Sequence, residues 1–252
     1  MEIYVGCCGI PGGLKRYSEE FKVTEINSTF YKIPKIETVQ RWRQIVPDNF
    51  IFTVKCHQAI THPTTSPTWK KSGIKDFKEL KDKVGFLNPT KEVLEYWRKT
   101  VEVCRILRAP LCLIQLPASF IENEENIENM NKFFSKIERN GLAIALELRG
   151  WSRERFRQAC EEFDLISCVD PMKDEPLYFS KRKIGYFRLH GSYRGERINY
   201  KYKYTIEDLK NLKEKVEKSN CNIAYVMFNN VYMREDARQF IELLSGQGHK
   251  VC

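Results

Sequence analysis

Apolar residues along the chain gather into eight short runs, and polar residues follow each run. The runs are nearly continuous rather than alternating, which is typical of strands covered on both faces, as in a parallel sheet. The predicted strands are Ile3–Cys7, Val23–Ile26, Phe50–Val54, Cys112–Leu116, Ala143–Leu146, Leu165–Val169, Gly185–Leu189 and Ala224–Phe228.

Between these runs, apolar residues recur every three to four positions, which predicts helices. The predicted helices are Glu37–Val46, Glu92–Leu107, Glu124–Arg139, Ser152–Phe163, Thr205–Lys218 and Glu235–Leu244. Two connections lack a convincing helix. After the first strand, Ser18–Phe21 offers about one turn, and after the sixth strand Pro171 and Pro176 indicate a loop.

Strands that alternate with helices predict right-handed crossovers and a parallel sheet. Eight strands in 252 residues fit a single (β/α)₈ TIM-type barrel spanning residues 1–252, with incomplete outer helices after strands one and six. The alternative is a doubly wound open sheet, although neither GxGxxG nor GxxxxGK[ST] occurs. The least regular segment, Ala59–Thr90, holds three prolines and is predicted to be a lid.

Charge and cysteine content add weaker indications. Lys and Arg number 42 against 33 Asp and Glu, a net charge of +9, which fits an anionic partner or a Lys-rich solvated surface. No apolar stretch approaches the roughly 18 residues that would span a bilayer, and the start does not read as a signal peptide. Nine cysteines without a CxxC pair lie mostly in apolar runs, which favours a reducing, cytoplasmic location.

Polar residues follow every predicted strand, where a barrel of this type builds its site. They are Cys7 and Cys8, Glu25 and Asn27, Lys55 and His57, Gln115, Glu147 and Arg149, Asp170, Arg188 and His190, and Asn229 and Asn230. Within each pair spaced by two residues, both side chains lie on one side of the strand. Any one of these residues could simply cap the barrel or bond a loop, but their presence at all eight strand ends indicates a site.

Several motifs resemble the DUF72 (YecE-like) family. They are Glu25-Ile-Asn-Ser-Thr-Phe-Tyr31 with Pro34, Arg41-Trp42, Pro47, Phe50, Phe52, Val54-Lys55, Thr61-His62, Glu147-Leu-Arg149, Phe187-Arg-Leu-His-Gly191 and Tyr225-Val-Met-Phe-Asn-Asn230. The resemblance implies a (β/α)₈-type barrel of unassigned activity, with a distant likeness to xylose isomerases and endonuclease IV. The chain departs from the family at Gly6-Cys-Cys-Gly-Ile10, where Gly-x-Ser-Gly-Trp is usual, and at His190-Gly-Ser192, where His-Gly-Arg is usual. Ligand contacts made by that Trp and Arg are therefore not expected here.

The first functional hypothesis is a metal-free site for a small phosphate-bearing anion at the barrel mouth. Lys55, Arg149 and Arg188 would bind it, since Arg offers a bidentate fork and Lys a point charge. Further binding candidates are Asn27, Gln115, Asp170, Asn229 and Asn230, and the candidates for acid–base catalysis are Glu25, His57, Glu147 and His190. The rival interpretation is that Glu25 and Glu147 neutralise the three cations in a structural network.

Two alternatives come from other classes. A metal-dependent hydrolase of the endonuclease IV type would draw its ligands from Glu25, His57, His62, Glu147, Asp170 and His190. A nucleic-acid-binding module would use the loop Tyr193–Tyr204, in which Arg and Lys alternate with Tyr. The sequence names no cofactor and no oligomeric state.

Overall fold

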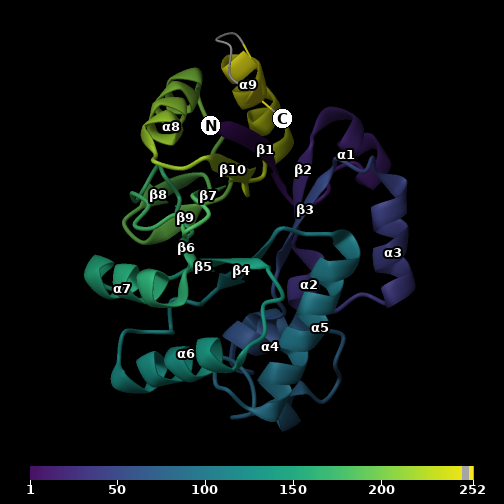
Figure 1. Cartoon of the computed structure of the whole chain (residues 1–252), viewed down its shortest axis with the longest axis vertical. Coiled ribbons are helices and arrows are strands. Elements are labelled where there is room, and N and C mark those ends of the chain that lie inside the picture. The colour runs from purple at the N-terminus through teal and green to yellow at the C-terminus, as the bar shows by residue number, and fades with distance from the viewer. Residues whose placement is uncertain (246–249, 252) are drawn as a thin grey trace. The chain divides into compact units, whose positions relative to one another are not determined.

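A computed structural model describes residues 1–245 and 250–251 (Figure 1). These residues form two compact units that interleave along the sequence. Unit 1 comprises Met1–Glu25, Ile45–Ile51 and Cys160–Cys252, and unit 2 comprises Ile26–Gln44 and Phe52–Ala159.

Unit 1 holds the first two strands and the last third of the chain. Its elements are β1 (Glu2–Cys8), α1 (Leu14–Glu20), β2 (Val23–Ile26), β6 (Ile166–Ser167), β7 (Ile184–Leu189), β8 (Ser192–Arg194), β9 (Arg197–Asn199), α8 (Ile206–Lys218), β10 (Ile223–Phe228), α9 (Met233–Ser245) and β11 (Lys250–Val251). The last residue of β2 is assigned to unit 2.

The sheet of unit 1 is parallel, with β1 between β2 and β10, and β7 on the far side of β10. Every residue of β7 is buried, as continuous apolar strands of parallel sheets are. Helix α9 packs on β1 and β10, and its Phe240 ring meets Phe228 of β10 at 6.0 Å between centroids. Thr205 and Asp208 cap α8 reciprocally, with each side chain bonded to the other residue's backbone N–H.

Unit 2 holds the middle of the chain. Its elements are α2 (Ser28–Tyr31), α3 (Ile36–Ile45), β3 (Ile51–Lys55), α4 (Gln58–Thr61), the 3₁₀ turns η1 (Pro67–Lys71) and η2 (Phe77–Leu80), α5 (Lys91–Leu107), β4 (Leu111–Gln115), α6 (Glu124–Lys136), β5 (Ala143–Glu147) and α7 (Arg153–Phe163). The end residues of α3, β3 and α7 fall in unit 1.

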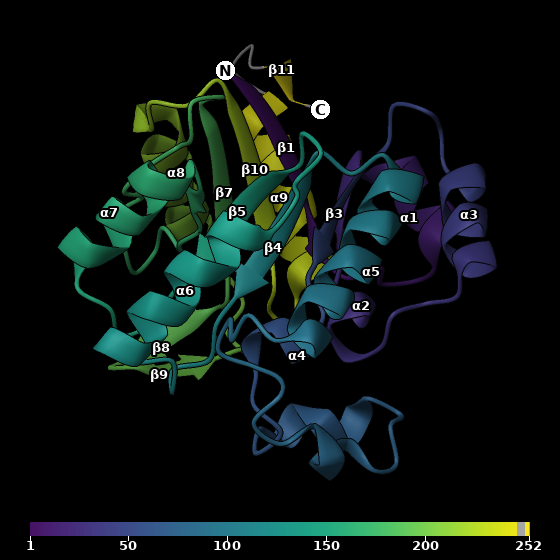
Figure 2. The same cartoon turned by 60° about the horizontal axis from the view of Figure 1, so that its bottom comes forward.

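In unit 2, β3, β4 and β5 run parallel in that order. Helices α5 and α6 lie together beside these strands (Figure 2), and Trp97 of α5 meets Phe133 of α6 edge-on at 5.8 Å. All five residues of β4 are buried. The carboxyl ends of the three strands therefore lie along one edge, and their terminal side chains define the surface from which a site can be built.

The irregular segment expected as a lid follows β3 and is tied to α4. The N–H groups of Gly85, Phe86 and Leu87 bond the carbonyl oxygens of Ala59, Thr61 and Ile60 at 2.7 to 3.2 Å. Figure 2 shows the segment, in blue, extending from α4 beyond the carboxyl end of β3. The segment thus starts at the end of the sheet where a lid is needed, and lid motion stays a prediction.

All eight predicted strands and six predicted helices are present, with ends shifted by a few residues. Helix α1 has seven residues, so the first connection holds about two turns rather than one. Residues 168–183 contain no helix, as the two prolines there indicated. The hairpin β8–β9, α2, α4 and the 3₁₀ turns were not predicted, because segments of three to five residues carry too little periodicity.

Candidate functional site

In unit 1, Glu25 and Arg188 form a buried, bidentate ion pair. Arg188 Nε lies 3.1 Å from Glu25 Oε2, and Nη2 lies 2.9 Å from Oε1. The Tyr186 hydroxyl donates to the same Oε2 at 2.8 Å. The two charged side chains are 2% and 0% exposed, so each charge depends on the other for compensation.

The adjacent thiols of Cys7 and Cys8 are buried in different surroundings. Cys8 lies against Glu25 and Arg188, whereas the Cys7 thiol reaches the Met233 carbonyl oxygen at 3.4 Å. Burial raises the pKa of Cys7 to about 12 and that of Cys8 well above its ordinary value. Both stay protonated at neutral pH, and a thiol that stays protonated is a poor nucleophile.

Asp170 organises the carboxyl end of β7. Its Oδ2 accepts the His190 backbone N–H at 2.9 Å and the Tyr193 hydroxyl at 2.7 Å, and Oδ1 accepts the Met172 N–H at 2.9 Å. Burial raises the pKa of Asp170, and these donors oppose that effect. The His190 Nδ1 lies 3.0 Å from the Asn229 amide nitrogen. Asp170, His190 and Asn229 are therefore brought together, with Asp170 positioning the loop.

Gly191 allows β7 to turn directly into the β8–β9 hairpin. Its φ is +105°, and a Cβ at this position would lie 2.3 Å from the Asn199 carbonyl oxygen. The Tyr204 hydroxyl bonds both its N–H and its carbonyl oxygen, at 2.8 and 3.1 Å. A side chain at position 191 would therefore push the hairpin away from His190.

In unit 2, four of the predicted residues form a row along the strand ends. Lys55 of β3 is in register with Leu113 of β4, and Gln115, two residues further along β4, is in register with Glu147 of β5. Since residues two apart on a strand share a face, the side chains of Lys55, Gln115 and Glu147 lie on one face of the sheet. Lys55 Nζ donates to Gln115 Oε1 at 2.9 Å, and Arg149 Nη2 lies 3.0 Å from Glu147 Oε1. The Lys55 ammonium also lies 4.1 Å from the centre of the Phe30 ring.

His62 is the buried group on which the two cations of this row act. Its Nδ1 lies 2.8 Å from the Thr61 hydroxyl, and its ring meets Phe30 edge-on at 4.9 Å. Burial, followed by the charges of Lys55 and Arg149, lowers the pKa of His62 to about 3. His62 is neutral at pH 7, and the row around it is electropositive.

His57 has a structural position. Its Nδ1 accepts the Ala59 N–H at 3.1 Å and so caps α4, and its ring stacks on Tyr96 at 4.3 Å. Burial lowers its pKa to about 4. His57 therefore stabilises the first turn of α4 as its N-cap.

Aromatic rings cluster in the loops that follow β4 and β5. Trp151 stacks on Phe120 at 5.4 Å and donates its indole N–H to the Phe120 carbonyl oxygen at 2.7 Å. Phe86, from the irregular segment, meets Phe120 at 5.7 Å. These rings come from the loops after β4 and β5 and from the proposed lid, so the lid contacts the loop that leaves the carboxyl end of β4.

The remaining predicted residues have local partners. Asn27 starts α2, and Asn230 donates to the Tyr202 carbonyl oxygen at 2.8 Å and to Asp236 at 2.6 Å. Sequence reasoning missed Tyr186 and Trp151. Tyr186 stands two residues before Arg188 and thus on the same strand face, a signal that was present in the sequence.

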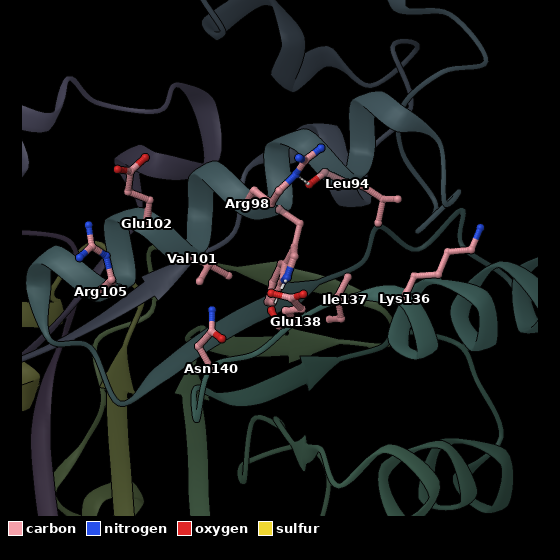
Figure 3. A pocket seen from close by; sticks show the side chains of 10 residues that line it. Leu94, Arg98, Val101, Glu102, Arg105, Lys136, Ile137, Glu138 and Asn140 are labelled. Atoms are coloured by element: carbon pink, nitrogen blue, oxygen red, sulfur yellow. Dashed lines mark hydrogen bonds between the residues drawn. The ribbon is translucent and has the colours of Figure 1, made fainter.

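A surface cavity of about 400 Å³ lies elsewhere in unit 2, between α5 and the end of α6 (Figure 3). It is lined by Leu94, Trp97, Arg98, Val101, Glu102, Arg105, Lys136, Ile137, Glu138 and Asn140. None of these belongs to a strand end. The lining mixes both charge signs with apolar groups and holds no histidine or cysteine, so it lacks the chemistry of the predicted site.

Residues 1–245 and 250–251 lack two features, one that a metal site needs and one that a membrane-spanning protein needs. No three His, Cys, Asp or Glu side chains there are grouped so that they could hold a metal ion. No helix in the same residues has both the length and the apolar character needed to cross a membrane.

Solved structures show the fold. A DUF72 family protein from Enterococcus faecalis V583 superposes with a TM-score of 0.71 at 22% identity, covering 97% of this chain and 98% of that one. A xylose isomerase domain-containing protein from Salmonella typhimurium gives 0.57 at 11% identity, covering 96% of both chains. Endonuclease IV from Thermus thermophilus gives 0.53 at 10% identity, covering 97% of both. The fold is thus of the (β/α)₈ TIM type, as predicted.

Sequence comparison gives the family. A Bacillus subtilis protein named UPF0759 protein YunF is 21% identical over 261 residues, covering 92% of this chain and 86% of its own length. The family model described as "Protein of unknown function DUF72" matches residues 7–251. This match extends over nearly the whole chain and agrees with the motifs at the strand ends, so the protein belongs to the DUF72 family.

Proposed function

We propose that unit 2 binds a small phosphate-bearing anion at the carboxyl ends of β3 and β5, through Lys55 and Arg149. The observation that carries this proposal is that Lys55 and Arg149 stand in one row at the ends of two strands, with the buried His62 within reach of both charges. Lys55 and Arg149 come from the ends of different strands, and both charges act on His62, so the site between them is electropositive. A phosphate is the natural counter-charge for it.

Accessibility supports Arg149 as the main ligand. Its side chain is 34% exposed, while its carboxylate partner Glu147 is 7% exposed. The Arg149 side chain is thus accessible to an incoming anion, and Glu147 orients its guanidinium. Lys55 is half-buried and is positioned by Gln115 and the Phe30 ring.

Arg188 is left out of this proposal, because Glu25 already neutralises it inside unit 1. Glu147 is the proposed acid–base group, since it lies within hydrogen-bond distance of the proposed phosphate ligand Arg149. Catalysis would require the ligand to present an exchangeable proton there, so binding is tested first.

The test is thermal unfolding of the full chain with inorganic phosphate, sulfate and a sugar phosphate, each against sodium chloride at equal ionic strength. Binding to the folded state raises apparent stability, by about 2.7 kcal/mol when the ligand is at 100 times its Kd. Wild type should be stabilised by at least one phosphate-bearing probe, and Arg149→Met should lose this stabilisation.

Two variants make the test specific. Lys55→Arg keeps the charge and should retain part of the stabilisation, whereas Arg98→Met removes an exposed cation of α5 and should retain all of it. Stabilisation that persists in Arg149→Met, or that is absent from wild type with every probe, overturns the proposal.

A further inference from the structure

Three exposed large apolar side chains cluster on unit 1, on a surface that the proposed anion site does not use. Tyr200 is 42% exposed, Val231 is 61% exposed and Tyr232 is 38% exposed. The Val231 N–H donates to the Tyr200 carbonyl oxygen at 2.8 Å, which holds the two loops together. Apolar groups gathered in this way on a protein surface mark an interaction site.

Cations accompany these rings. Lys201 and Lys203 are exposed and follow Tyr200 in the chain. The Lys203 ammonium lies 5.7 Å from the centre of the Tyr232 ring. Arg194 and Arg197 face each other in the β8–β9 hairpin, and both are exposed. The hairpin's acidic residue, Glu196, lies 2.7 Å from Lys173. Residues 194–203 therefore carry four cations and one carboxylate, and one of these cations, Lys203, lies beside an exposed ring.

We propose that this tyrosine–lysine surface, consisting of Arg194, Arg197, Tyr200, Lys201, Lys203 and Tyr232, binds single-stranded nucleic acid. Bases would stack on Tyr200 and Tyr232, and the phosphates would lie against the Lys and Arg side chains. Base–aromatic stacking combined with a positive groove is the general physics of single-strand binding. The proposal goes beyond the anion site of unit 2 and does not depend on it.

The surface is preorganised because Tyr202 and Tyr204 anchor the segment, whereas Tyr200 is exposed. Tyr202 and Tyr204 point into the fold: the Tyr202 hydroxyl donates to Asp208 at 2.6 Å, and Tyr204 is 3% exposed and bonded to Gly191. Asn230 holds the Tyr202 carbonyl oxygen at 2.8 Å. Two anchored tyrosines thus fix the backbone that directly follows the exposed Tyr200.

The surface also adjoins the strand-end cluster of unit 1. The Tyr200 ring lies 6.0 Å from the His190 ring, edge to face. A base stacked on Tyr200 would therefore lie near the histidine at the carboxyl end of β7. Acidic peptides and anionic membranes would also be attracted by the charge, but neither would require both rings.

The experiment measures fluorescence anisotropy of labelled dT₁₂ and rU₁₂ with the full chain over a range of sodium chloride concentrations. Wild type should bind at low salt, with an affinity that falls linearly on a logarithmic salt scale. Tyr200→Ala and Tyr232→Ala should each weaken binding roughly fivefold to a hundredfold without changing the salt slope. Lys201→Ala and Lys203→Ala should each reduce that slope by about one.

Matched variants separate this surface from general charge. Tyr200→Phe and Tyr232→Phe keep the rings and should bind like wild type, which also covers the possibility that an alanine variant fails to fold. Lys210→Ala and Lys218→Ala, exposed on α8, should leave binding unchanged. The proposal is overturned if wild type does not bind, if removing the rings has no effect, or if the α8 variants lose as much affinity. Equal binding of phosphatidylserine vesicles or poly-glutamate, insensitive to the rings, also overturns it.

Discussion

Arg188, inside β7, and Arg149, just after β5, each pair with a glutamate, yet their surroundings differ. Arg188, bonded to Glu25 through Nε and Nη2, is 2% exposed, whereas Arg149, bonded to Glu147 through Nη2, is 34% exposed. Tyr186 adds a third donor to Glu25. The first pair is closed to solvent, and the second is open on one side.

The difference separates structural from functional charge. Two buried charges depend on each other, so removing either one leaves a costly unpaired ion. A partly exposed pair contributes little to stability because water screens it. Arg149 can therefore exchange water for a ligand at small cost to the fold, while Arg188 cannot.

The largest expected effect is that of Glu25→Gln, which leaves Arg188 charged and without its buried carboxylate. We expect the free energy of unfolding to fall by about 3 to 5 kcal/mol. Urea denaturation followed by circular dichroism measures this change. Glu19→Gln, at an exposed position on α1, should change stability by less than about 0.5 kcal/mol. A loss below about 1 kcal/mol for Glu25→Gln would show that the pair is not the structural element described here.

Tyr186→Phe should have an intermediate effect, because it removes one donor from a carboxylate and leaves the ion pair in place. The expected loss is about 1.5 to 3 kcal/mol, the range for hydrogen bonds to charged groups. Chemical denaturation again provides the measurement. Tyr178→Phe, whose hydroxyl lies 3.3 Å from Asp164 nearer the surface, is the matched control and should lose less. An equal loss in both variants would remove the special status of the Glu25 site.

The smallest effect on stability at pH 7 should come from Arg149→Met, below about 1 kcal/mol. The same variant should raise the pKa of His62 above about 3 but leave it below its ordinary 6.5, because burial, the largest cause of the lowering, and the Lys55 charge both remain. A histidine titration by NMR in wild type and variant checks this shift. Arg98→Met should leave His62 unchanged.

The sign of the pH dependence follows from the same group. Between pH 6.5 and 3 the unfolded chain protonates His62 and the folded chain does not, so stability falls as the pH falls through this range. Because Arg149→Met raises the pKa of His62 in the folded chain, it narrows this pH range. The variant should therefore lose less stability in acid than wild type. If the variant changed neither the dependence of stability on pH nor the pKa of His62, the Arg149 charge would not be a cause of the lowered pKa.

The strands were predictable because apolar runs such as β4 and β7 are buried along their whole length. Helix α1 was underestimated, since Lys15, Arg16 and Glu19 hide the helical face that Tyr17 and Phe21 provide. The β8–β9 hairpin was missed because its strands have three residues each and depend on Gly191 and Tyr204 rather than on their own pattern.

For the site, strand ends and two-residue spacing identified the polar residues, while their partners depended on tertiary structure. Glu25 and Arg188 are 163 positions apart in the sequence, and no local pattern joins them. The neutral state of His62 likewise arises from its burial, from Lys55 seven positions earlier and from Arg149, which is 87 positions later in the sequence. The identity of the polar residues at the strand ends, and the strand face on which they lie, could be predicted from the sequence. Their exposure to solvent could not, because it depends on the tertiary structure.

The buried thiols have a practical consequence. All eight cysteines in the described residues are buried and outside any disulfide, and both units contain several of them. Cys7, Cys8, Cys160, Cys168 and Cys221 belong to unit 1, and Cys56, Cys104 and Cys112 to unit 2. Alkylation by a small maleimide then requires local or global opening of the unit that holds each thiol. Peptide-resolved labelling rates in mild denaturant would therefore report whether the two units open in a single cooperative step or one before the other.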